Sequence, residues 1–133
     1  ALVHADALCK RIDRPSKPLI LQLAQVAGKL LLDVRASGVL SGQALGKAGD
    51  ETANEFLCHA LRTQRPDDGL LSEEEKDNLK RLSKSRVWII DPVDGTREYG
   101  EERTDWAVHV ALAIDGRPEI GAVGSHYHSR SWR

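Results

Sequence analysis

Apolar side chains recur at helical spacing in the first half of the chain. A helix is predicted from Pro18, a residue that suits a first helical turn, to a stop at Gly38. Its buried face consists of residues three or four positions apart, namely Ile20, Leu23, Ala24, Ala27, Leu31 and Val34. Residues 39–49 are rich in glycine and small side chains and predict a loop. A second helix is predicted from about Asp50 or Thr52 to just before Pro66.

The second half of the chain predicts one short helix and then strands. Residues 72–82 are expected to form a surface helix, because Ser72 and Glu75 have the spacing of a capping box. The apolar runs 87–90 and 107–114 predict buried strands, and Asp115-Gly116 predicts a hairpin turn into a returning strand at 120–123. Helices followed by strands predict an α+β fold with helices packed on a mixed or antiparallel sheet.

Composition narrows the classes of protein that fit this pattern. The chain has 133 residues, of which 41% are hydrophobic and 29% are charged, which is typical of one soluble domain. The formal net charge is −1 with both signs interspersed, so neither a nucleic acid polymer nor a membrane is an expected partner. No run approaches a membrane span, and residues 1–18 lack the apolar core of a signal peptide, so we expect a cytoplasmic protein with a poorly ordered N-terminal segment. Cys9 and Cys58 are expected to be free thiols.

Acidic residues stand where apolar elements meet loops. Asp91 and Asp94 follow the strand 87–90 directly, while Glu73 and Asp50 lie at earlier junctions. Each has an ordinary explanation as a turn or a helix cap. Taken together they predict a cleft of carboxylates that would repel one another without a cation, and the Val93 carbonyl offers a neutral oxygen ligand beside them.

The residues after Asp94 predict an anion site next to this cleft. If Gly95 and Thr96 open a helical turn, their free amides point at a bound anion, such as a phosphate. A phosphate ester could then bridge to the cation.

These motifs resemble the inositol monophosphatase superfamily of metal-dependent, typically lithium-sensitive phosphatases. Residues 91–96, Asp-Pro-Val-Asp-Gly-Thr, resemble the signature of that superfamily. Residues 71–74 resemble its upstream glutamate motif, 48–50 its earlier aspartate motif, and 106–112 the strand after the signature. The resemblance covers about residues 19 to 123 and implies the N-terminal half of the layered α/β sugar-phosphatase fold.

The resemblance also implies a substrate class. Thr-Arg-Glu-Tyr at residues 96–99 is most similar to the bisphosphate nucleotidases of sulfur assimilation, which remove the 3′-phosphate of adenosine 3′,5′-bisphosphate. Inositol monophosphates and sugar phosphates such as fructose 1,6-bisphosphate remain open as alternatives. The expected partner is therefore a small phosphorylated molecule.

Roles for single residues follow from the resemblance. It implies that Glu73, Asp91 and the Val93 carbonyl bind one Mg²⁺, and that Asp91 bridges to a second ion that Asp94 also binds. It implies that the substrate is held by Asp94, Gly95 and Thr96. The catalytic residues that it implies for attack by a metal-activated water are Asp50, Glu73, Glu74 and Thr96. His109 is interpreted instead as a packed histidine of a buried strand.

The chain departs from the superfamily in its second half. Members are commonly about twice this length and carry a further metal-binding aspartate in a Trp-Asp motif, which this sequence does not contain. We therefore expect residues 19–124 to be an incomplete N-terminal domain and residues 125–133 to be a divergent tail. The chain alone is expected to be weakly active or inactive, and to form homo-oligomers through an exposed edge at 120–123. The alternative is a catalytically inert folding or interaction domain whose acidic residues are only caps and turns.

Overall fold

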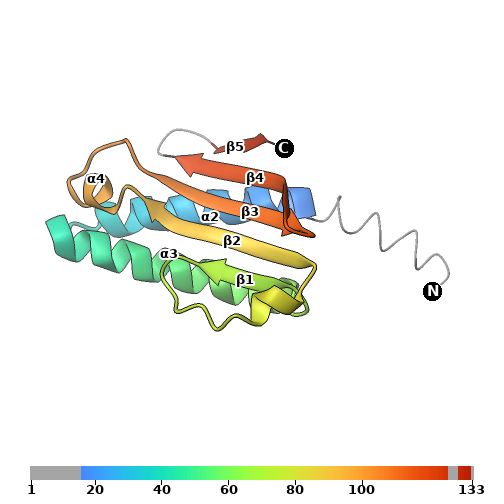
Figure 1. Ribbon diagram of the computed structural model, residues 1–133. Helices are drawn as coiled ribbons and strands as arrows, with labels where there is room; N and C mark the ends of the chain where they lie inside the picture. The colour runs from blue at the N-terminus through green and yellow to red at the C-terminus, as the bar shows by residue number, and fades with distance from the viewer. Residues whose placement is uncertain (1–15, 126–128, 133) are drawn as a thin grey trace.

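Two long helices cover one face of a five-stranded sheet (Figure 1). The structure is a computed structural model that describes residues 16–125 and 129–132. Its helices are α2 (Ser16–Ala36), α3 (Gly42–Gln64), the short α4 (Thr96–Gly100) and the 3-10 helix η1 (Lys80–Ser83). Its strands are β1 (Gly69–Ser72), β2 (Arg86–Asp94), β3 (Ala107–Ile114), β4 (Arg117–Ser125) and β5 (Ser129–Trp132). The predicted α+β class is confirmed.

The sheet is mixed, with strands in the order β1-β2-β3-β4-β5. β1 runs parallel to β2, and every other neighbouring pair is antiparallel. α2 packs against β3 and β4, while α3 packs against β2 and β1. Because the helices cover only one face of the sheet, burial alternates along β2. Trp88 and Ile90 are buried beneath the helices, whereas Ile89 lies on the other face and is 41% exposed.

The N-terminal expectations are settled only in part. Residues 1–15, including Cys9, lie outside the described residues. Residues 16–18, expected to belong to a poorly ordered segment, instead form the first turn of α2. Cys58 is a buried free thiol, as predicted. Among the described residues, no helix combines the length and the apolar character needed to cross a membrane.

The loop predicted at 39–49 is correct for residues 39–41 and wrong from residue 42 onward, because α3 begins at Gly42. Asp50 therefore lies inside the helix and is not its N-cap. Gly46 and Gly49 serve close packing instead of a loop conformation. A Cβ on Gly46 would lie 2.9 Å from Thr96 Cγ2, and one on Gly49 would lie 2.5 Å from the Tyr99 ring. The small residues of α3 thus let α4 approach its backbone.

The helix predicted at 72–82 is also wrong. The apolar pair Leu70 and Leu71 belongs to β1, where these residues lie opposite Trp88 and Ile89 of β2. Ser72 ends the strand and forms a turn instead of a capping box. Its Oγ accepts a hydrogen bond from the Glu74 amide at 3.2 Å, and its carbonyl accepts one from the Glu75 amide at 3.2 Å. Tertiary pairing of the leucines has overridden the local helix signal.

The exposed edge predicted at 120–123 is wrong as well. Residues 121–124 of β4 pair with β5, which supplies backbone partners from the expected tail. The outer strands are therefore β1 and β5. Association of copies through an edge strand stays a prediction, and β4 no longer supports it.

Candidate active site

Two parallel strands bring the first carboxylates together. Ser72 of β1 lies beside Ile90 of β2, and parallel strands end at the same edge of a sheet. Glu73 and Asp91, which follow these two positions, therefore emerge side by side. The Glu73 amide donates to the Ile90 carbonyl at 3.3 Å, which fixes the turn that carries Glu73 and Glu74.

A bulge in β2 aligns the next carboxylate. Asp91 lies opposite His109, and Asp94 lies opposite Ala107, so three residues of β2 advance against two of β3. Side chains three positions apart in a regular strand point to opposite faces. The extra residue cancels this alternation, and Asp91 and Asp94 lie on the same face.

α3 supplies the third segment of the site. Asp50 is only 9% exposed, and its two carboxylate oxygens lie 3.0 and 3.2 Å from Thr96 Oγ1. The same hydroxyl lies 3.1 Å from the Val93 carbonyl. Gly95 precedes it with φ of 92°, a left-handed conformation that favours glycine. The turn of the sequence motif is thus tied to α3 as well as to β2.

The pKa of Asp91 is raised by its surroundings. Burial raises the pKa of Asp91 to about 6, and the negative charges of Glu73, Asp94 and Glu74 contribute to the rise. His109 acts in the opposite direction. A carboxylate with raised pKa among other carboxylates is typical of a functional site.

Asp50 shares this environment from the helix side. Burial raises the pKa of Asp50 to about 6, against the hydrogen bond from Thr96, which lowers it. Glu74 and Asp91 add to the rise. Asp50 thus lies close enough to Asp91 of β2 and to Glu74 of the turn after β1 for their charges to act on its pKa.

The donor set fits a hard divalent cation, although the side chains do not surround one point. Among the described residues, no three Asp, Glu, His or Cys side chains are grouped closely enough to hold a metal ion. The predicted ligands Glu73, Asp91 and Asp94 nevertheless lie at one edge, beside the Val93 carbonyl. Carboxylate and carbonyl oxygens are the ligands that Mg²⁺ prefers, and a cation would relieve their mutual repulsion.

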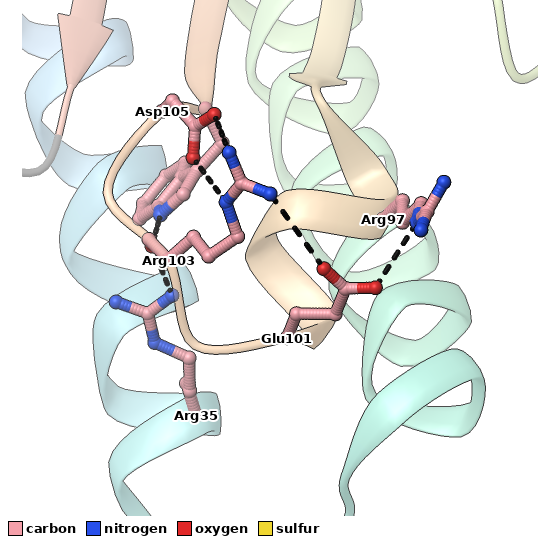
Figure 2. A network of polar contacts seen from close by, with 6 residues as sticks. Arg35, Arg97, Glu101, Arg103 and Asp105 are labelled. Atoms are coloured by element: carbon pink, nitrogen blue, oxygen red, sulfur yellow. Dashed lines mark hydrogen bonds and ion pairs between the residues drawn. The ribbon is translucent and has the colours of Figure 1, made fainter.

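The loop after α4 closes against the Gly95 turn. Arg35 of α2 donates from Nη1 to the carbonyl of Arg103 at 2.8 Å (Figure 2). The same nitrogen donates to the carbonyl of Tyr99 at 3.2 Å. Arg103 in turn pairs with Asp105 at 2.7 Å. A Cβ on Gly95 would lie 2.9 Å from the Asp105 carbonyl, so the loop lies directly against the turn. No pattern in the sequence indicates that Arg35 binds this loop.

Two hollows flank the turn. One has a volume of about 510 Å³ and is lined by Asp94, Gly95, Glu98, Asp105, Trp106 and Ala107. The other has a volume of about 440 Å³ and is lined by Gly42, Gln43, Gly46, Thr96, Arg97 and Glu101. The predicted substrate-binding residues therefore border open space on both sides.

His109 was misassigned by the sequence reasoning. The buried positions of β3 are Val108, Val110 and Leu112, whereas the His109 side chain is 38% exposed on the opposite face, across from Asp91. Strict alternation along 107–114 was the signal that places it there.

Comparison with known proteins agrees with this geometry. The model of the inositol monophosphatase family matches residues 17–133. The chain belongs to the inositol monophosphatase family. It is 51% identical over 111 residues to the 3′-phosphoadenosine 5′-phosphate phosphatase of Mycobacterium leprae, covering 77% of this chain and 41% of that protein. It is 54% identical over 99 residues to the Mycobacterium tuberculosis protein of the same name, covering 71% of this chain and 37% of that protein.

The fold of this family member is also found in solved structures. The suhB protein of Bartonella henselae superimposes with a TM-score of 0.71 at 25% identity, covering 82% of this chain and 43% of that one. The chain therefore spans less than half the length of each of these three proteins.

Proposed function

We propose that this chain carries the cation- and phosphate-binding part of a magnesium-dependent phosphatase that acts on adenosine 3′,5′-bisphosphate. One observation carries the proposal. The hydrogen-bonded pair Asp50–Thr96 lies close to the edge of the sheet at which Glu73 and Asp91 lie. The substrate is supported by the names of the two mycobacterial relatives and by residues 96–99.

The acidic edge is the proposed cation site. Glu73, Asp91, Asp94 and the Val93 carbonyl would hold Mg²⁺. When bound there, the cation would lower the pKa of a water molecule and neutralise charge on the phosphate.

The residues of the turn have the remaining tasks. Gly95 and Thr96 would bind phosphate oxygens through their amides, with Asp94 beside them. Ionised Asp50 accepts the Thr96 hydroxyl proton, which leaves the Thr96 oxygen free to accept a proton from the attacking water. Glu73 and Glu74 would be the further proton acceptors, and the charge of Glu74 already acts on the pKa of Asp50. Reaction by direct attack of water needs no nucleophilic side chain.

Cation binding tests the first part of the proposal. Thermal unfolding of the 133-residue chain should shift upward with MgCl₂ more than with NaCl of equal ionic strength, because a ligand of the native state stabilises it by about 2.7 kcal/mol at a hundredfold excess over its Kd. Asp91→Asn should remove most of this shift, while Asp33→Asn on the solvent side of α2 should leave it intact. Equal responses to both salts would favour the inert domain and overturn the proposal.

Substrate choice needs a second experiment. With Mg²⁺ present, adenosine 3′,5′-bisphosphate should stabilise the chain more than inositol 1-phosphate or fructose 1,6-bisphosphate, and phosphate release should be weak. Release of phosphate from an inositol or sugar phosphate, with none from the nucleotide, would replace the proposed substrate.

A cytoplasmic location belongs to the proposal and rests on the sequence.

A further inference from the structure

One side chain outside the proposed ligand set contacts it directly. His109 Nε2 lies 3.1 Å from Asp94 Oδ2. His109 belongs to β3, where it lies opposite Asp91, and its side chain reaches Asp94 three positions further along the bulged strand. The strand pairing therefore places the backbone of His109 beside both aspartates, and its imidazole contacts Asp94.

We propose that His109 is a positioning residue for Asp94, and that it sets the affinity of the acidic edge for a divalent cation; this inference rests on the proposed function. Asp94 is 64% exposed in its side chain and lies at the end of β2, so the strand alone leaves its carboxylate several rotamers. The imidazole N–H donates to Oδ2 and holds the carboxylate in one orientation. Oδ1 is then presented to a cation at a lower entropic cost.

General chemistry supports a role for His109 in orienting Asp94 and a role for Asp94 in binding the cation. Partners that donate a hydrogen bond to a ligating carboxylate orient it, and their loss typically costs 10–100-fold in metal affinity. The same contact contributes little to folding, since both side chains are partly exposed and such pairs contribute about 0–1 kcal/mol. A change at His109 should therefore alter cation binding while leaving the fold intact.

A Mg²⁺ titration of the whole chain, followed by calorimetry and thermal unfolding, tests the inference. His109→Ala should raise the Mg²⁺ midpoint by about 10-fold, with the unfolding temperature in the absence of Mg²⁺ unchanged. His109→Gln places an N–H donor at a similar reach and should restore most of the affinity. His59→Ala, at an exposed position of α3, is the matched control and should have no effect.

A double variant identifies the route of the effect. In an Asp94→Asn background, His109→Ala should cause no further loss, because the proposed role acts through Asp94. A His109→Ala midpoint equal to or lower than that of the unaltered chain overturns the inference, as does a loss of stability without Mg²⁺ that leaves the midpoint unchanged. Absence of a Mg²⁺ response in the unaltered chain overturns the proposed function as well, so the two failures are distinct.

Discussion

Replacing Gly46 by alanine should displace Thr96, and the structure gives the size of the effect. The new Cβ would lie 2.9 Å from Thr96 Cγ2 and 3.1 Å from the Thr96 carbonyl oxygen. Carbon atoms in contact prefer about 3.5–4.0 Å, so the two segments must separate by at least about 0.6 Å. Thr96 cannot simply rotate, because its hydroxyl is bound between Asp50 and the Val93 carbonyl.

Two energies of opposite sign decide the outcome. Alanine is more favourable than glycine inside a helix by about 1 kcal/mol. Overpacking of a close contact costs about 1–3 kcal/mol. Gly28→Ala supplies the helix gain alone, because a Cβ at this buried position of α2 meets nothing within 4 Å. The Gly46 variant should therefore be less stable than the Gly28 variant by about 1–3 kcal/mol.

Thermal unfolding of both variants by circular dichroism measures this difference. It corresponds to about 4–12 °C between the two unfolding temperatures for a domain of this size. The Mg²⁺ response of the Gly46 variant should also weaken, since Thr96 and the turn before it are displaced. An alanine at Gly46 that stabilises the chain as much as one at Gly28 would refute the packing argument.

Three further predictions concern titration and buried charge. Without divalent cations, the free energy of unfolding should increase as the pH falls from about 7 to about 5. The reason is that the carboxyls of Asp50 and Asp91 bind protons near pH 6 in the native state and only near pH 3.8 in the unfolded chain. A free energy of unfolding that decreases over this pH range would contradict the prediction. Combining Asp50→Asn with Asp91→Asn should flatten the same curve and raise stability at neutral pH, as denaturant titration would show. Asp68→Ala should cost about 3–5 kcal/mol in urea unfolding, since it strips the partner from Arg86, whose side chain is only 16% exposed, and from the Trp88 indole N–H at 2.8 Å.

Part of this architecture could be predicted because burial leaves a periodic trace in the sequence. The helix that buries Ile20, Leu31 and their neighbours follows from spacing alone, and so does the strand around Ile90. The convergence of Glu73 and Asp91 could not be worked out in this way. It depends on β1 pairing parallel to β2, which is a non-local contact; only the positions of the acidic residues at the ends of apolar elements, and then the family resemblance, indicated it.

The errors have physical causes. Gly46 and Gly49 were taken for loop residues, although the lack of a Cβ there serves the approach of α4 to a helix. Ser72 and the acidic residues after it have the spacing of a helix start, but backbone pairing with β2 was stronger than this local preference. The apolar character of its strand predicts a buried His109. The face on which its side chain lies depends instead on the alternation of side chains along β3, which places His109 opposite to Val108 and Val110.

The outermost position of β1 has a consequence for the dynamics of the site. This four-residue strand is held to the sheet through β2 alone, yet the turn that carries Glu73 and Glu74 follows it directly. Short edge strands open at low free energy, well before global unfolding. Fraying of β1 would carry both glutamates away while the rest of the molecule stays folded. A bound cation would oppose this opening, so amide hydrogen exchange in β1 should report on occupancy of the acidic edge.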